Sequence, residues 1–270
     1  MRIAGAPISW GVCEVPDWGH QLPPTRVLRE MAALGLTATE LGPDGYLSAD
    51  RLREYGLRCA GQFHPVLLHD PAHDPLPGLS AAAGGAMVLA AATGVDGYDA
   101  RPALDERGWD TLLANLDRID AEFGRVAVLH PHVGTMVETR EEVGRVLAGS
   151  SIALCLDTGH LLIGGTDPAE LVATDPGRIA HVHLKDVDAP MADRVRRGEL
   201  TYTEAVSQGL YRPLGQGDVD VASIVKGLEK SGYTGWYVLE QDVILTGSGD
   251  DPAADVRASL AYLDKVAGVG

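Results

Sequence analysis

The chain has 270 residues, of which 45% are hydrophobic and 22% are charged. This composition supplies a core for one large folded domain and excludes a disordered chain. No apolar run approaches the roughly 20 residues that cross a bilayer, and the first residues lack a secretory signal, so we expect a cytoplasmic protein without a membrane span. The net charge of −16, from 22 Lys and Arg against 38 Asp and Glu, opposes binding to nucleic acid.

The three cysteines, Cys13, Cys59 and Cys155, are widely spaced and form no CxxC pair. This pattern favours buried reduced thiols over a disulfide framework or a zinc-thiolate site. A bound metal ion would therefore be held by histidine and carboxylate side chains.

Short apolar runs alternate with amphipathic stretches along the whole chain. The runs expected as strands are 2–7, 37–42, 58–63, 87–92, 126–131, 152–157, 179–184 and 236–241. The stretches expected as helices are 25–34, 48–55, 108–123, 139–148, 168–174, 219–231 and 252–266. Eight strands alternating with helices predict an α/β fold, a (β/α)8 TIM barrel, as a single domain over 1–270. A doubly wound sheet is the alternative, but no glycine-rich nucleotide loop follows any strand.

Two connections depart from a regular barrel. The segment 64–86, between the third and fourth strands, is rich in proline, so we expect the third helix to be short or replaced by irregular chain. After the seventh strand, residues 185–218 are far longer than a usual connection of 2–6 residues and carry a helical pattern at 190–207. We expect this second connection to form a lid over the mouth of the barrel.

Ionisable residues stand at the ends of the expected strands, where a parallel barrel places its active site. Asp157, His183 and Glu240 each end a strand or lie next to its end, and His130 and His132 follow the fifth strand. Alone, these three could be a helix cap, a core histidine and a surface ion-pair partner, but one shared metal site explains all three positions. Oxygen and imidazole ligands suit Mn²⁺, Co²⁺, Fe²⁺, Mg²⁺ or Zn²⁺, with His130 or His132 as the fourth ligand.

Five further residues are candidates for substrate contact. Glu40 ends the second strand, His64 follows the third, and Trp10 follows the first as a flat wall for a sugar or cyclitol ring, with core packing as an equal alternative. His160, in the turn after the sixth strand, could bind a hydroxyl, act as acid or base, or be an exposed loop histidine. Lys185 could hold a substrate oxygen or pair with its acidic neighbour.

The motifs, in this order, resemble the xylose-isomerase-like barrel superfamily of sugar isomerases and epimerases, and most closely its inosose dehydratases. The matching pieces are APISWG at 6–11, ATELGP at 38–43, LHPHVGT at 129–135, LDTGH at 156–160, HVHLKD at 181–186, PLGQGDVD at 213–220 and VLEQD at 238–242. They span almost the whole chain. DTGH, HVHLKD and the last glutamate are specific for the superfamily, whereas HPHVGT and the long insertion favour the dehydratase branch.

The resemblance implies that Asp157, His183 and Glu240 bind a divalent metal, Mn²⁺ or Co²⁺, and that His160 and Lys185 contact the substrate. Many superfamily members have a glutamate where His130 stands, so this chain departs from them at the fourth ligand. The implied partner is a small polyol or keto-sugar, and a homo-oligomer is compatible with the resemblance.

The implied reaction is dehydration of a keto-cyclitol through an enediolate. Glu240 or His132 would be the base and His160 the acid, with Lys185 stabilising the enediolate charge. If the enediolate is instead reprotonated, the same site would be a ketose 3-epimerase or an aldose-ketose isomerase. A barrel that binds a polyol without catalysis is the alternative of another class, and it would hold no metal.

Overall fold

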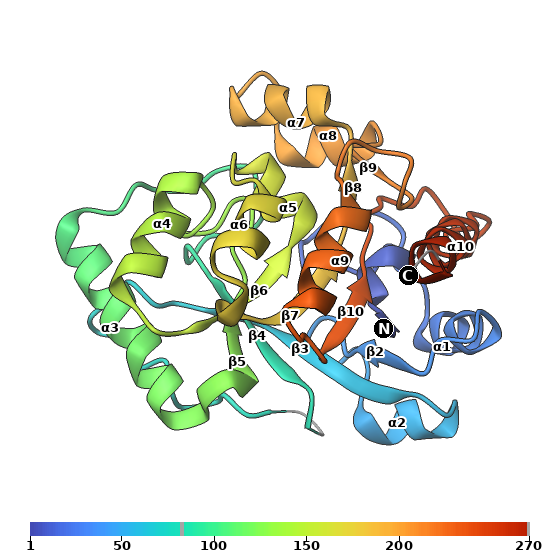
Figure 1. The fold of residues 1–270 in the computed structure, drawn as a ribbon, viewed down its shortest axis with the longest axis horizontal. Helices are drawn as coiled ribbons and strands as arrows, with labels where there is room; N and C mark the ends of the chain where they lie inside the picture. Colours follow the sequence, from blue (N-terminus) through green and yellow to red (C-terminus); the bar gives the residue numbers. More distant parts are fainter. Residues whose placement is uncertain (82–83, 269–270) are drawn as a thin grey trace.

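All the expected strands are present and lie side by side in one closed parallel barrel (Figure 1). The computed structural model describes residues 1–81 and 84–268. The barrel strands are β1 (Arg2–Gly5), β2 (Ala38–Glu40), β3 (Arg58–Val66), β4 (Ala86–Ala91), β5 (Ala127–Leu129), β6 (Ala153–Asp157), β7 (Ile179–Leu184) and β10 (Trp236–Leu239). Because β10 pairs with both β7 and β1, the ring closes, and the predicted TIM barrel is confirmed.

The expected helices surround the barrel, with ends that differ by a few residues from the sequence-based ranges. They are α1 (Pro24–Ala33), α2 (Ala49–Glu54), α3 (Glu106–Phe123), α4 (Arg140–Gly149), α6 (Pro168–Thr174), α9 (Val221–Lys230) and α10 (Ala253–Gly268). The sequence analysis missed the short helix α5 (Thr158–Ile163), which begins directly after β6. In the part of the chain that the structure describes, no helix has the length and apolar character of a membrane span.

The two unusual connections take different forms. The described residues between β3 and β4 contain no α-helix, as expected from prolines, which cannot donate a backbone hydrogen bond. The 185–218 connection, which we call the insertion, contains α7 (Ala189–Arg196) and α8 (Tyr202–Ser207) where one helix was expected. Gly198, with φ of 70°, lies at the break between them. The two-residue strands β8 (Asp186–Val187) and β9 (Tyr211–Arg212) pair antiparallel at the base of the insertion.

The alternation of side chains along β6 and β7 decides which residues reach the barrel interior. Leu154 and Leu156 of β6 pack into the large apolar cluster that includes the core faces of the helices. The alternate residues Cys155 and Asp157 face inward instead, because successive side chains of a strand point to opposite faces. In register with them on β7 are His181 and His183. The carboxyl ends of these strands therefore deliver polar side chains to one mouth of the barrel.

Candidate active site

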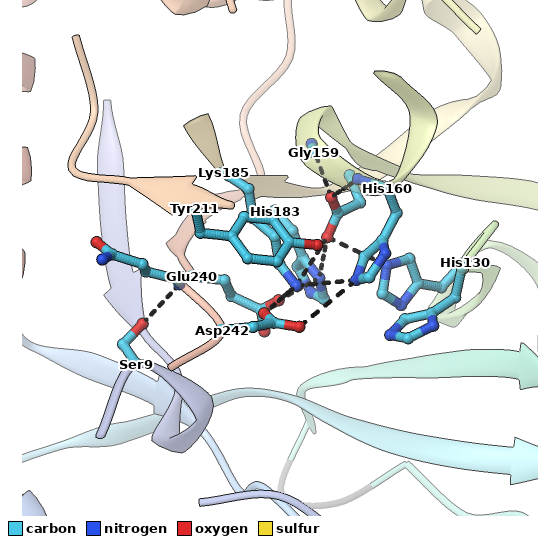
Figure 2. A network of polar contacts seen from close by, with 12 residues as sticks. Ser9, His130, Gly159, His160, His183, Lys185, Tyr211, Glu240 and Asp242 are labelled. Carbon is cyan, nitrogen blue, oxygen red and sulfur yellow. Dashed lines mark hydrogen bonds and ion pairs between the residues drawn. The ribbon is translucent and has the colours of Figure 1, made fainter. Parts of the chain in front are cut away.

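A cavity opens at the carboxyl ends of the strands, with about 560 Å³ of empty space including its open mouth. Its lining combines apolar side chains with a group of buried ionisable ones. Figure 2 shows part of this group, including His130, His183, Lys185, Glu240 and Asp242. The ionisable and histidine lining residues are Glu14, Glu40, His130, His132, His183, Lys185, Glu240 and Asp242. A concave site with converging polar groups is the usual form of an enzyme active site.

Asp157 uses its two carboxylate oxygens for different purposes. Oδ1 accepts hydrogen bonds from the backbone N–H groups of Gly159 and His160, at 2.9 and 2.8 Å, and so caps α5. Oδ2 faces the cavity cluster, 3.4 Å from Nδ1 of His183. The geometry of Asp157 therefore fits both interpretations, a cap of α5 and a metal ligand. Complete burial opposes ionisation of Asp157, but the Lys185 ammonium and the contacts with His130 and His183 hold its pKa well below its usual value.

His183 is oriented by Glu40 from across the barrel. Oε1 of Glu40 lies 3.0 Å from Nε2 of His183 and 2.7 Å from Nε2 of His181, so it can accept a hydrogen bond from each ring. With Nε2 engaged, Nδ1 of His183 points toward Oδ2 of Asp157 and Oε2 of Glu240, at 3.4 and 3.1 Å. This buried Nδ1 makes no hydrogen bond of good geometry within the described residues. A histidine held this way by a carboxylate is a common arrangement around protein-bound metals.

The donor atoms of Asp157, His183 and Glu240 lie within 4.8 Å of one another. His130, not His132, stands against this group, with Nε2 at 3.2 Å from Oδ2 of Asp157. Complete burial, joined by the charge of His183, lowers the pKa of His130, so its imidazole is neutral and has a lone pair to offer. Two carboxylates and two imidazoles at this spacing can hold a divalent cation such as Mn²⁺, Co²⁺ or Zn²⁺.

Lys185 lies at the centre of the polar network in Figure 2. Its Nζ is 2.5 Å from Oδ1 of Asp242, 3.2 Å from Oε2 of Glu240 and 3.0 Å from Nε2 of His160. Burial opposes the charged form, but Asp242, Asp157 and Glu240 outweigh it and raise the pKa of Lys185 well above its usual value. The cavity therefore contains a fixed ammonium group that can stabilise negative charge on a substrate oxygen.

His132 and His160 stack, with ring centroids 3.7 Å apart, but they have different access to the cavity. His132 lines it, whereas His160 is only 1% exposed and lies behind Lys185. Nδ1 of His132 is 2.7 Å from the carbonyl oxygen of Val133, so it carries the proton and leaves Nε2 as an acceptor. Burial, with the nearby Lys185 ammonium, holds the pKa of His132 well below its usual value. A neutral His132 can accept a proton from a bound molecule.

Three polar residues of the site were not identified from the sequence. Asp242 follows β10 and binds Lys185, and Tyr202 and Tyr211 come from the insertion. The Tyr202 hydroxyl donates to Oδ2 of Asp242 at 2.5 Å and lies 2.9 Å from the Tyr211 hydroxyl. Two sequence features could have indicated these residues: the aspartate that follows Glu240 in the EQD motif, and the two tyrosines within the long connection after the seventh strand. The insertion therefore contributes two tyrosines to the polar network of the site, and its role as a lid stays a prediction.

Two expected substrate contacts lie elsewhere. Trp10 is fully buried, its Nε1 donates to Glu30 at 2.8 Å, and its ring does not line the cavity. The core-packing alternative therefore describes Trp10, and the tryptophan that lines the cavity is Trp18, whose Nε1 donates to the carbonyl of Val243 at 3.0 Å. His64 lines a neighbouring cavity beside the proline-rich connection. Its position on β3 turns it away from the metal-ligand candidates.

Comparisons with known proteins agree with this geometry. The family described as "Xylose isomerase-like TIM barrel" matches residues 78–266. The inosose dehydratase of Geobacillus kaustophilus is 34% identical over 305 aligned residues, covering 98% of this chain and 94% of that protein. The rhizopine catabolism protein MocC of Rhizobium meliloti is also 34% identical, over 90% of this chain and 82% of its own.

Solved structures share the fold at low sequence identity. An L-ribulose 3-epimerase superposes with a TM-score of 0.65 at 15% identity, covering 98% of this chain and 94% of that one. The IolI protein, whose crystal structure has a bound zinc atom, superposes with a TM-score of 0.64 at 14% identity, covering 98% of each chain.

Proposed function

The chain belongs to the xylose isomerase-like TIM barrel family and is an enzyme of its lyase or isomerase class, and from this premise we propose that it dehydrates a keto-cyclitol in a metal-dependent reaction. Relatives named inosose dehydratase match at 26–34% identity over 90–98% of this chain, which supports a cyclitol ring as the substrate. The substrate class is therefore a small polyol ketone.

One observation carries the proposal: the environment of Nδ1 of His183. Glu40 engages Nε2 of this ring, and two carboxylate oxygens, from Asp157 and Glu240, face Nδ1. Two negative oxygens that converge on one imidazole nitrogen call for positive charge between them, which either a proton on Nδ1 or a divalent cation supplies. We propose that a divalent metal would replace that proton and be held by Asp157, His183 and Glu240, with His130 as the fourth ligand.

A divalent ion held there would bind a ketone oxygen and the neighbouring hydroxyl, and so make the adjacent carbon more acidic. We propose Mn²⁺ or Co²⁺ from the resemblance to inosose dehydratases, and the carboxylate and imidazole ligands suit these ions as well as Zn²⁺. Trp18 and Phe63 line the same cavity and supply flat apolar faces against a ring.

The residues around the bound ring divide the proton transfers between them. His132 or Glu240 accepts the proton from carbon, and the structure supports His132 because its Nε2 is free and its ring lines the cavity. Lys185 lines the cavity, so we assign its ammonium both the stabilisation of the oxygen that gains negative charge and the donation of a proton to the departing β-hydroxyl. His160 lies 3.0 Å behind that ammonium, so we assign it the support and reprotonation of Lys185 in place of direct donation to substrate.

The test is turnover of 2-keto-myo-inositol by the purified chain supplied with Mn²⁺, combined with elemental analysis. We expect a rise in ultraviolet absorbance from the conjugated product. A ketose epimerase or isomerase would exchange solvent deuterium into its substrate without that absorbance. This second outcome would replace dehydration with the alternative reaction of the same enediolate.

Substitutions separate the metal site from general folding. The Asp157→Asn, His183→Ala double variant should lose bound metal and activity together, because it removes two of the proposed ligands. His20→Ala changes a histidine outside the cavity and should retain both. Activity that survives the double substitution would contradict the proposal.

A further inference from the structure

A second chamber lies beside the candidate active site and opens to solvent, with about 1110 Å³ of empty space including its mouth. Three residues, Glu14, Pro43 and Phe63, line both cavities, so the two cavities adjoin at these side chains. The proposed reaction uses none of the residues that line the second chamber alone. A substituent on a ring held above the metal-ligand candidates would reach the second chamber by passing Phe63.

The chamber exists because the connection after β3 is irregular. Its outer wall is formed by the proline-rich segment around Pro75 and Pro77, and its inner wall by the outer part of β3. In a regular barrel unit an amphipathic helix follows the strand and packs against it. Here the described residues between β3 and β4 contain no such helix.

The lining of the chamber is suited to hydroxyl groups. The lining includes the imidazole of His64 and the side-chain amide of Gln62. Burial lowers the pKa of His64, against the opposing charge of Asp44, so the imidazole is neutral. A neutral ring nitrogen and an amide both pair well with sugar hydroxyls.

Charge limits what the chamber accepts. Glu14 and Asp44 line it, and no Lys or Arg is present among its described lining residues. A phosphate or carboxylate would meet like charges without a cationic partner. Apolar faces from Phe63 and Leu79 offer contact area to the carbon face of a ring.

We infer that the preferred substrate is a keto-cyclitol that carries a neutral, O-linked sugar-like substituent, and that this substituent occupies the second chamber. The inference rests on the proposed function for the ring at the metal-ligand candidates, and it adds the substrate class that the chamber selects.

The experiment compares two substrates: 2-keto-myo-inositol, and the same ring with an O-linked galactosyl group. We expect kcat/KM for the galactoside to exceed that for the bare ring by about tenfold or more. Turnover of the bare ring without such a preference would overturn the inference and leave the proposed function standing.

Binding of unreactive ligands tests the chamber independently of turnover. By isothermal titration calorimetry, the O-galactoside of myo-inositol should bind at least about tenfold more tightly than myo-inositol itself. If neither ketone is turned over, the proposed function fails, and this ratio alone decides the inference. Equal affinities, or no detectable binding of the galactoside, overturn it.

A variant that fills the second chamber tests whether the preference for the galactoside arises there. Gln62 lines the second chamber and not the first, so Gln62→Trp should abolish the galactoside preference and change kcat/KM for the bare ring by less than about twofold. Gln208→Trp is the matched control, because this residue is exposed on the insertion and lines neither cavity. A preference unchanged in Gln62→Trp would place the substituent elsewhere and contradict the inference.

Discussion

The two long connections at the mouth of the barrel differ in how their backbone is held. In the insertion, the carboxylate of Asp186 accepts backbone hydrogen bonds from Val187, Gly215, Gly217 and Val219, all within 3.0 Å. In the described part of the connection after β3, the side-chain hydrogen bonds are local turns, such as Asp70 to the N–H of Ala72, and two single contacts from α3, with no carboxylate that gathers several backbone N–H groups.

The insertion and the connection after β3 are both long, but they serve different purposes. The insertion closes back on its own start through β8 and β9, which fixes Tyr202 and Tyr211 against Asp242. The connection after β3 lacks such a closure in its described part and leaves a chamber open to solvent. A loop whose base is closed by hydrogen bonds can hold catalytic side chains in fixed positions. A loop without such a closure can leave room for a ligand.

The largest effect should come from removing the Asp186 carboxylate, which holds the base of the insertion together. Asp186→Ala leaves backbone N–H groups without an acceptor, at a cost of about 1–3 kcal/mol for each that water cannot reach, so we expect about 3 kcal/mol less stability to urea. Turnover should fall with it. Asp186→Asn keeps one acceptor oxygen and should lose about half as much. A loss below about 1 kcal/mol for Asp186→Ala would show that the closure does not depend on this carboxylate.

A second, smaller effect concerns what the insertion delivers to the site. Tyr202→Phe removes the hydroxyl that holds Asp242, so kcat/KM should fall about tenfold, with a stability loss of about 1 kcal/mol. Tyr233→Phe is the control, since its hydroxyl bonds the carbonyl of Trp236 at the opposite end of β10. It should lose similar stability and no activity. Equal activities of the two variants would count against a catalytic contribution from the insertion.

For the other connection, the anchor with the largest expected effect is Asn115 on α3, whose Nδ2 donates to the buried carbonyl of Leu68 at 2.9 Å. Asn115→Leu should cost about 1 kcal/mol in a denaturant titration, because one carbonyl loses its partner. Turnover of a bare ring should not change. A loss of several kcal/mol would mean that this connection is held as firmly as the insertion.

The smallest effect is expected at the ion pair between Asp74 and Arg118, whose atoms approach to 2.8 Å on the exposed surface. Exposed pairs contribute little to stability because water and salt screen them. Asp74→Ala should therefore leave the melting temperature within about 1 °C of the parent. A larger shift would reveal structure in this segment beyond its local turns.

The strands and the inward positions of Asp157 and His183 could be predicted because they follow from a period-two pattern. The resemblance to the xylose-isomerase-like superfamily, read from the motifs, is confirmed by the family match. The choice between Trp10 and Trp18 could not be predicted. Both follow β1, and the turn that buries one and presents the other depends on Gly11 at φ 74° and Asp17 at φ 59°.

The same reasoning explains the other residues that the sequence did not identify. Tyr202 reaches Asp242 only because the insertion folds back over the mouth, a contact across 40 residues that no local pattern encodes. His160 has the expected position in the turn after β6, but Lys185 stands between it and the cavity. Packing decides which of two neighbouring polar groups faces the substrate. A sequence pattern does not carry that information.

Glu40 has a consequence for the order in which the protein acquires its activity. This carboxylate belongs to β2, yet the two imidazoles it engages lie 141 and 143 residues further along the chain. Contacts of such long sequence separation form late, after the entropy of closing the loop has been overcome. On a ribosome, we expect the emerging amino-terminal half to acquire helices and strand pairs while His183 has no fixed orientation. Metal affinity would then appear abruptly with ring closure, as a late event of folding.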